Sequence, residues 1–155
     1  MAKSKKTGGH KAKMASHLVN VLSDTYVLAI KLHGYHWNVT GPAFYGLHKQ
    51  FEDQYKELIE AADELAERLR VMEVYAPGSM ELFLQNSAIK EASVSPISAS
   101  AMIKDLLKSH EILRARLAEA AEVADDCDDD VSEGMLIDRL AYHDKVIWML
   151  RSQLA

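Results

Sequence analysis

The feature that most constrains the fold is an unbroken apolar stripe between residues 44 and 72. Apolar side chains recur there every three or four residues, at Phe44, Leu47, Phe51, Tyr55, Leu58, Ala62, Leu65, Leu69 and Met72. This spacing places them on one face of a single α-helix about 45 Å long. The chain has only 3 Pro and 7 Gly in 155 residues, which argues against a turn-rich β-sandwich and favours long helices.

The spacing of apolar residues, together with capping and helix-breaking residues, predicts three further long helices. The first runs from about Ala12 to Thr40, with Leu18, Leu22, Thr25, Ala29 and Leu32 on one face, and Gly41-Pro42 ends it. The third runs to about Ala124, and its start is predicted at Ser95-Pro96, as an N-cap followed by a proline in the first turn. The fourth follows the acidic turn Asp125–Asp130 and runs to about Gln153; Asp130 and Glu133 have the spacing of a capping box.

The lengths of the connections predict the topology. The links between the first and second and between the third and fourth helices are short, so each pair should form an antiparallel hairpin. About 23 residues join the two hairpins, with a short helix at Met80–Gln85 capped by Ser79. A four-helix bundle with a long middle crossover is the ferritin-like arrangement. The predicted fold class is therefore all-α, a ferritin-like four-helix bundle over residues 14–155.

Charge is distributed unevenly along the chain. Residues 1–13 contain no acid and five lysines, namely Lys3, Lys5, Lys6, Lys11 and Lys13, which leaves 13 basic residues against 23 acidic ones in the remainder. The segment has too few apolar residues to order itself, so we expect a disordered basic tail. Such a tail suits a polyanion such as DNA, through salt-sensitive phosphate contacts without base readout; a solubilising terminus is the alternative.

Several classes of protein are excluded or disfavoured. One Cys excludes a disulfide framework, and no Cys/His spacing resembles a zinc finger. No apolar run approaches the roughly 20 residues that a membrane span needs, and no apolar segment follows the N-terminal lysines as in a signal peptide. We therefore expect a protein of a reducing, cytoplasmic compartment with no membrane partner.

Two pairs of side chains have the chemistry of metal ligands. His36 and His48 lie at similar distances on either side of Gly41-Pro42, so an antiparallel hairpin brings them to the same height. Asp63 and Glu67 are an i,i+4 pair on the second helix. Imidazole with carboxylate suits Fe, Mn or Zn. Tyr35, Trp37, Phe44 and Tyr45 are expected in the core of the hairpin.

The two pairs cannot bind one ion within one chain. His48 and Asp63 are 15 residues apart on a continuous helix, or about 22 Å along its axis, whereas metal–ligand bonds are about 2 Å. Either each pair is an isolated half-site, or a two-fold symmetry mate supplies the missing half. Surface ion pairs would equally explain the carboxylates. Asp63 and Glu67 would then pair with Arg68 and Arg70, and Glu52 would pair with Lys49 or Lys56.

An ordered set of motifs in this region resembles the Dps family of mini-ferritins. The residues that carry the resemblance are His36-Trp37-Asn38 with Gly41, then Phe44, Leu47-His48, Phe51-Glu52 and Tyr55, and finally Asp63 with Ala66-Glu67-Arg68. The resemblance implies a hollow homo-dodecamer that oxidises Fe(II), preferentially with hydrogen peroxide, and stores the ferric product. Some members of the family also bind double-stranded DNA without sequence preference.

The resemblance also implies roles for individual residues. It assigns the ferroxidase ligands to His36 and His48 of one subunit and to Asp63 and Glu67 of its two-fold mate. Glu52 occupies a position for a further carboxylate near the iron. The entry pore of the family lies near the start of the last helix, where the candidate residues are Asp129, Asp130, Glu133 and Asp138.

The intrasubunit di-iron site of ordinary ferritins is disfavoured, because no Glu lies three residues before any His. Two other readings of the sequence stay open. Zinc is an alternative occupant of a site made of two His and two carboxylates. The alternative function is a DNA-compacting structural protein whose metal site is vestigial or holds zinc.

Overall fold

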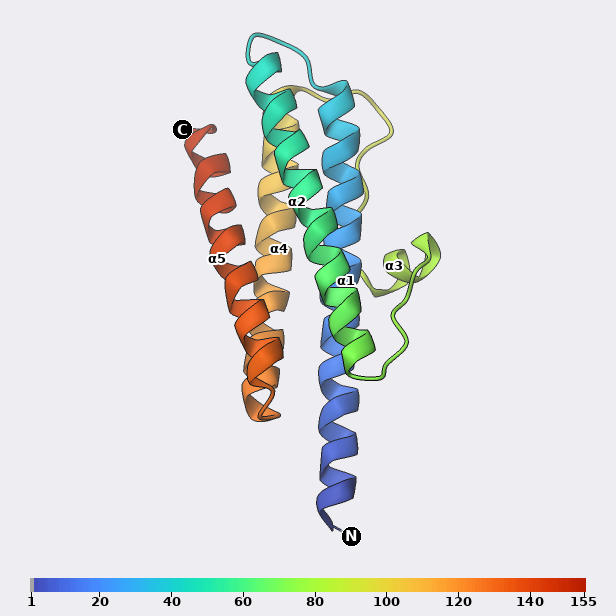
Figure 1. The fold of residues 1–155 in the computed structure, drawn as a ribbon. Helices are drawn as coiled ribbons and strands as arrows, with labels where there is room; N and C mark the ends of the chain where they lie inside the picture. Colours follow the sequence, from blue (N-terminus) through green and yellow to red (C-terminus); the bar gives the residue numbers. More distant parts are fainter. Residues whose placement is uncertain (1) are drawn as a thin grey trace.

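The protein is an all-helical bundle in the computed structural model, which describes residues 2–155 and the side chains from Gly9 onward. Four long helices, α1 (Ala2–Asn38), α2 (Phe44–Val71), α4 (Ala99–Asp126) and α5 (Asp130–Ser152), form the bundle, and the short α3 (Met80–Asn86) lies beside it (Figure 1). Residues 2–155 contain no strand. The predicted all-α class, with a short helix in the long crossover, is confirmed.

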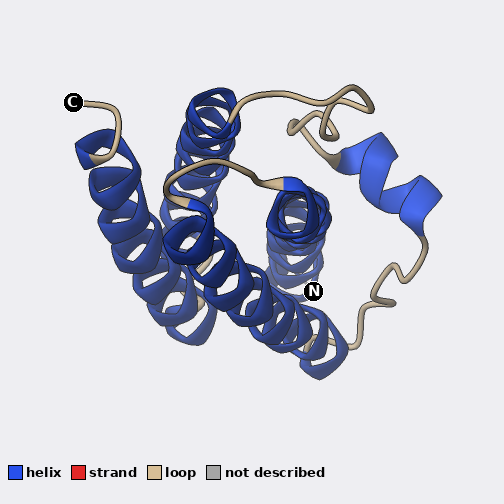
Figure 2. Cartoon of the chain, turned by 90° about the horizontal axis from the view of Figure 1, so that it is seen from above, coloured by secondary structure: helices blue, strands red, loops and turns tan. Residues whose placement is uncertain are grey.

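The helices pack as two antiparallel hairpins. α1 packs against α2 and α4 against α5, while α1 joins the two hairpins through its contact with α4. Seen along the bundle, α5 lies at one side of α4 and α3 lies on the far side of α1 (Figure 2). The turn between α1 and α2 therefore lies at one end of the bundle, and the turn between α4 and α5 lies at the other (Figure 1).

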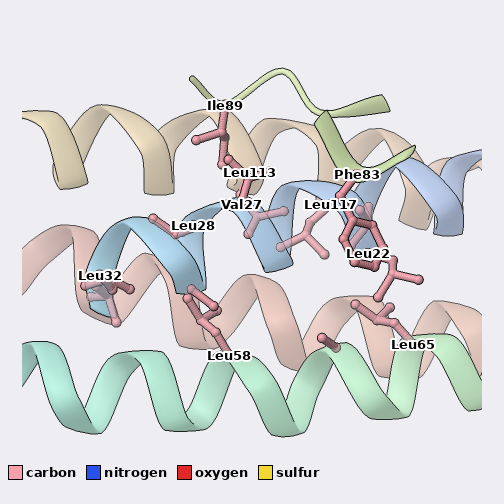
Figure 3. Packing of buried hydrophobic residues seen from close by; sticks show 14 of the residues in the cluster. Leu22, Val27, Leu28, Leu32, Leu58, Leu65, Phe83, Ile89, Leu113 and Leu117 are labelled. Carbon is pink, nitrogen blue, oxygen red and sulfur yellow. The ribbon is translucent and has the colours of Figure 1, made fainter. Parts of the chain in front are cut away.

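The core consists of leucines from the four long helices, closed on one side by the crossover. Leu22 of α1, Leu58 of α2 and Leu113 of α4 are completely buried. Phe83 and Ile89 come from the crossover and point into this core (Figure 3). The Phe83 ring also stacks on Tyr26 of α1, with 4.5 Å between ring centroids. These contacts attach the long crossover to α1.

Two buried polar clusters fix α1 to its neighbours. Asp24 is fully buried and accepts hydrogen bonds from Ser87 Oγ (2.6 Å) and from the backbone nitrogens of Ala88 (2.7 Å) and Ile89 (3.3 Å). Arg116 Nε of α4 lies 3.3 Å from the same carboxylate. The second cluster joins α1 to α4: the ammonium of Lys31 lies 2.9 Å from Asp105 and donates to Ser109, and the Tyr35 hydroxyl donates to Asp105. Each cluster satisfies a buried charge with a partner from another segment.

Gly41 makes the turn between α1 and α2. Its φ of 107° lies in the region that side chains avoid, and its carbonyl accepts a hydrogen bond from Phe44 N at 3.0 Å. The turn is therefore short, and it places the end of α1 directly beside the start of α2.

One predicted helix cap is confirmed and one is wrong. Ser79 Oγ accepts from Leu82 N at 3.3 Å and caps α3 as expected. The start predicted at Ser95-Pro96 is wrong, because α4 begins at Ala99 and is capped by Ser98, whose Oγ accepts from Ala101 N at 3.2 Å. Both serines satisfy the local rule for a cap, so the sequence alone does not distinguish between them.

The capping box predicted at Asp130 and Glu133 is also wrong, by one residue. Asp129 is the N-cap of α5 and accepts hydrogen bonds from the backbone nitrogen (3.1 Å) and hydroxyl (2.7 Å) of Ser132. Its carboxylate also pairs with Arg68 of α2 at 2.6 Å. This ion pair to another helix favours Asp129 over its neighbour as the cap.

The N-terminal segment differs from the expected disordered tail. α1 is helical from Ala2 onward, and its first turns extend beyond the bundle (Figure 1). Packing begins at Met14, which is buried. Lys11 lies 3.2 Å from Glu73, and Lys13 lies 3.7 Å from Asp126. A helix that continues from a packed segment needs no new nucleation, which explains its extension into polar sequence. The side chains of Lys3, Lys5 and Lys6 lie outside the described residues.

Candidate metal centre

His36 at the end of α1 and His48 in the first turns of α2 lie in direct contact. Their rings are stacked, with 3.8 Å between centroids and 21° between planes. His36 Nδ1 lies 2.8 Å from the carbonyl oxygen of His48, and His48 Nδ1 lies 2.8 Å from the carbonyl oxygen of His36. The prediction that the hairpin brings the two histidines together is confirmed.

This reciprocal arrangement determines the tautomer of each ring. A carbonyl oxygen only accepts hydrogen bonds, so each Nδ1 must carry the proton and donate it. In the neutral ring, Nε2 then keeps its lone pair. Metal-ligating histidines typically donate Nδ1–H to a carbonyl or carboxylate oxygen, because this bond fixes the ring and leaves Nε2 as the ligand atom. Both rings are partly exposed, so metal ions can reach them.

Aromatic rings surround the two histidines. Tyr55 stacks on His33, with 4.1 Å between centroids, and meets His36 edge-on at 5.5 Å. The expectation that four aromatic residues lie in the hairpin core is confirmed for Tyr35 alone, which is buried. The other three are exposed, by the following fractions: Trp37 (65%), Phe44 (44%) and Tyr45 (80%).

Asp63 and Glu67 lie on an exposed face of α2, and neither has an ion pair or a side-chain hydrogen bond among the described residues. The expected pairing with Arg68 and Arg70 is therefore wrong. Arg68 donates instead to Asp129 and to Ser132 Oγ of α5, and Arg70 donates to the carbonyl oxygen of Val74. Both carboxylates are free to bind a cation.

The histidine pair and the carboxylate pair do not meet within the chain. Both belong in part to the continuous helix α2, where 15 residues separate His48 from Asp63, or about 22 Å. Among the side chains from Gly9 onward, no three His, Cys, Asp or Glu residues converge to hold an ion. The chain thus presents two separate half-sets of ligands.

Glu52 lies one turn after His48 and is held by two lysines. Lys49 Nζ lies 2.9 Å from one carboxylate oxygen, and Lys56 donates to the other. These hydrogen bonds, first from Lys56 and then from Lys49, lower the pKa of Glu52 to about 2. The ion-pair reading of Glu52 is confirmed. A cation would have to displace these ammonium groups to bind it.

The four acids suggested for an entry pore differ in their surroundings. The carboxylate of Asp129 accepts hydrogen bonds from Ser132, as the N-cap of α5, and from Arg68. Asp130 and Asp138 are exposed, Glu133 is partly buried, and none of the three has a side-chain partner among the described residues. The pore assignment stays a prediction.

The chain is similar to known ferritin-like proteins. The ferritin-like domain family matches residues 15–155. DNA protection during starvation protein 2 of Bacillus anthracis is 34% identical over 84% of this chain and 89% of its own length. The chain belongs to the Dps family of ferritin-like proteins. An uncharacterized low temperature-induced protein of Nostoc is 38% identical, over 84% of this chain and 74% of its own.

The fold of this Dps-family chain matches that of solved relatives. The Dps protein of Vibrio cholerae O1 superposes with a TM-score of 0.91 at 30% identity, covering 95% of this chain and 92% of its own, and is described as a member of the ferritin-like diiron-carboxylate superfamily. Membership of that superfamily implies iron binding. The predicted family and ferritin-like fold are confirmed. Over the part of the chain that the structure describes, no helix is long and apolar enough to cross a membrane.

Proposed function

We propose that this protein is a mini-ferritin that oxidises Fe(II) at a site formed between two subunits and stores the ferric product in a homo-dodecameric cage. The observation that carries the proposal is the pair of half-sets. His36 and His48 present bare Nε2 atoms at one point of the chain, and Asp63 and Glu67 present unpaired carboxylates about 22 Å away. In a dimer with two-fold symmetry, the histidines of each subunit can meet the carboxylates of the other, which gives two complete sites.

Exposed apolar side chains next to the histidines support a subunit contact there. Trp37 adjoins a cavity of about 450 Å³ between α1 and α3, whose other walls include Ile30, Met80 and Leu84. All four side chains are more than 40% exposed in the single chain. A contiguous exposed apolar patch of this kind is typical of a protein–protein interface. A second copy bound here would lie within reach of the histidine pair.

The proposed reaction is a two-electron transfer to peroxide. One hydrogen peroxide and two protons take one electron from each of two Fe(II) ions, which gives two Fe(III) and two waters without releasing hydroxyl radical. Imidazole nitrogens and carboxylates bind Fe(II) and leave positions open for the oxidant. Fe(III) is harder and moves to carboxylates. Asp129, Asp130, Glu133 and Asp138 are proposed as the entry path, and Glu52 as an additional carboxylate near the iron.

The test adds Fe(II) to anaerobic apo-protein, then half an equivalent of hydrogen peroxide, and follows ferric absorbance. The wild type should oxidise iron fast, to a small fixed number of ions per subunit. His36→Ala/His48→Ala should lose the fast phase while the cage stays intact by size-exclusion chromatography. His17→Ala, a change outside the proposed site, is the control. A rate equal to that of a protein-free control in the wild type would refute the proposal.

We also propose that the basic N-terminal segment binds double-stranded DNA without sequence preference, which would place the protein with the nucleoid in the cytoplasm. Twelve copies of the segment would add weak phosphate contacts through avidity. Lys11 and Lys13 already have acidic partners, Glu73 and Asp126. We therefore assign the larger share of binding to Lys3, Lys5 and Lys6.

DNA retardation at low salt tests this assignment. Deleting residues 1–13 should abolish retardation while iron oxidation survives. Replacing the first three lysines by Gln should weaken binding more than replacing Lys11 and Lys13. Unchanged retardation by the truncated protein would refute the DNA proposal.

The alternative, a DNA-compacting protein with a vestigial or zinc-occupied site, makes a different prediction. It expects no ferroxidase activity in the wild type, and it expects retardation that does not change in His36→Ala/His48→Ala. The free Nε2 atoms and unpaired carboxylates favour the ferroxidase. In a vestigial site, other side chains would be able to form hydrogen bonds or ion pairs with these groups.

A further inference from the structure

A second pair of histidines lies in the bundle core, on α4 and α5 and outside the α1–α2 hairpin that holds His36 and His48. His110 of α4 is 0% exposed and His143 of α5 is 1% exposed. Their Nδ1 atoms are 2.9 Å apart, a hydrogen bond between the two helices. His110 Nε2 is buried and has no partner among the described residues. Neither residue lies in a sequence motif with metal-ligand spacing.

This hydrogen bond requires the accepting ring to be neutral, and it is lost when both rings are protonated. Two Nδ1 atoms at this distance share one proton, so one ring donates and the other accepts. If His110 donates, its Nε2 is a bare acceptor in the core; if His143 donates, His110 Nε2 carries a buried N–H without a partner. The first arrangement is favoured, because a buried N–H without a partner is rarer in folded proteins than a buried acceptor without one. A further proton on either ring places a positive charge in the core.

Among the described residues, the carboxylates named below on the surrounding helices are already paired with other cations. On α5, the Arg139 guanidinium lies one turn from His143, but it pairs with Glu57 of α2 and covers the Tyr142 ring. At the surface, Asp144 is paired with Arg114 of α4. On α1, Lys31 is paired with Asp105, and its hydrogen bond to Ser109 is adjacent to His110. The nearest charge that acts on both rings is therefore a cation.

The electrostatics agree with this geometry. Burial, followed by repulsion from Arg139, lowers the pKa of His110 to about 3. Burial, with His110 and Arg139, lowers the pKa of His143 well below its ordinary value. Both rings therefore take up protons more readily when the core opens than when it is closed.

We propose that His110 and His143 form an acid-operated lock that holds α5 on the bundle while both rings are neutral and releases α5 when they are protonated. The backbone of α5 packs closely against α4. Its hydrogen bonds and ion pairs to α2 join Arg139 with Glu57, Asp129 with Arg68, and Gln153 with Gln50. Protonation of the pair breaks its bond to α4 and places two like charges beside Arg139.

Hydrogen exchange with mass spectrometry tests the lock on the assembled protein between pH 7.5 and 4.5, with rates corrected for intrinsic exchange. The opening constant of α5 should rise at least tenfold per pH unit below about pH 6, and up to about a hundredfold if both rings take a proton. α1 and α2 should show a smaller rise. His110→Gln/His143→Gln should lose the pH dependence of α5, while His10→Gln, at an exposed position, should keep it. An unchanged slope in the double variant, or equal slopes in all helices of the wild type, would overturn the proposal.

A measurement on the wild type alone covers the case in which the double variant does not fold. Exchange of the imidazole C2 hydrogen, read by mass spectrometry, reports the protonation of each histidine. His110 and His143 should stay neutral at pH 5.5 in the folded protein. Titration of both buried rings near pH 6.5 in the closed protein would overturn the lock.

Discussion

Two inactive variants should restore activity to one another if the metal site lies between subunits. One variant, His36→Ala/His48→Ala, keeps only the carboxylate half-set, and the other, Asp63→Ala/Glu67→Ala, keeps only the histidine half-set. Because about 22 Å separates the half-sets within a chain, no single chain completes a site. A mixed two-fold dimer has one intact site and one site that lacks all four ligands.

The expected recovery follows from the statistics of assembly. Random pairing of equal amounts of the two variants makes half of the dimers mixed, and each mixed dimer holds one working site of two. Co-expression with two different affinity tags should therefore yield about a quarter of the wild-type rate of peroxide-driven iron oxidation, from parents that are both inactive. Selecting assemblies that carry both tags enriches for the active species.

Two controls make the result decisive. Mixing the purified parents without reassembly should give no activity, since no mixed dimer forms. Co-expression of His36→Ala with His48→Ala should also give none, because both changes fall in the same half-set and every site lacks a ligand. No recovery in the first cross, with mixed cages present in the doubly selected material, would refute the intersubunit site even if the wild type oxidises iron.

Three further predictions concern stability. Asp24→Ala removes a buried carboxylate that serves three donors and Arg116, and should cost about 3–5 kcal/mol, or about 10 °C in the melting temperature; Asp24→Asn keeps an acceptor and should cost less than half as much. Gly41→Ala should cost about 1–2 kcal/mol in denaturant unfolding because φ is 107°, whereas Gly46→Ala, in a helix with open space around an added Cβ, should be neutral or stabilising. The unfolding free energy should fall as pH is lowered from about 6.5 towards 4, by about 1.4 kcal/mol per pH unit for each buried histidine, because these rings gain protons only on unfolding; a flat pH profile in urea titrations would contradict this.

The long helices could be predicted from sequence because each carries an apolar stripe that packing reinforces. The ends of the helices could not be predicted as well, since several residues at each end satisfy the same local rule. Ser95 and Ser98 are equally good caps in isolation, and the structure uses Ser98. Asp129 and Asp130 differ in that only Asp129 reaches Arg68, which is 61 residues away. A contact between residues this far apart in the sequence cannot be predicted from a local sequence pattern.

The candidate site, too, could be predicted only in part from the sequence. The meeting of His36 and His48 followed from their positions around one tight turn, so sequence was sufficient. Their tautomers required the reciprocal bonds to backbone carbonyls, which depend on the register between α1 and α2. Arg68 was a plausible partner of Glu67, its neighbour in sequence, until the fold brought a better one from α5.

The diversion of Arg68 links the architecture to the proposed chemistry. An arginine beside two carboxylates would normally neutralise them, and the resulting ion pair would compete with a cation. Here the guanidinium points to the start of α5, where Asp129 and Ser132 receive it. Among the side chains from Gly9 onward, the contact that attaches α5 to α2 therefore also leaves Asp63 and Glu67 without an ion-pair partner. Two exposed, uncompensated carboxylates one helical turn apart gain from any cation that arrives. A second subunit that brings two fixed imidazoles to the same point would convert that attraction into selective binding of a transition metal.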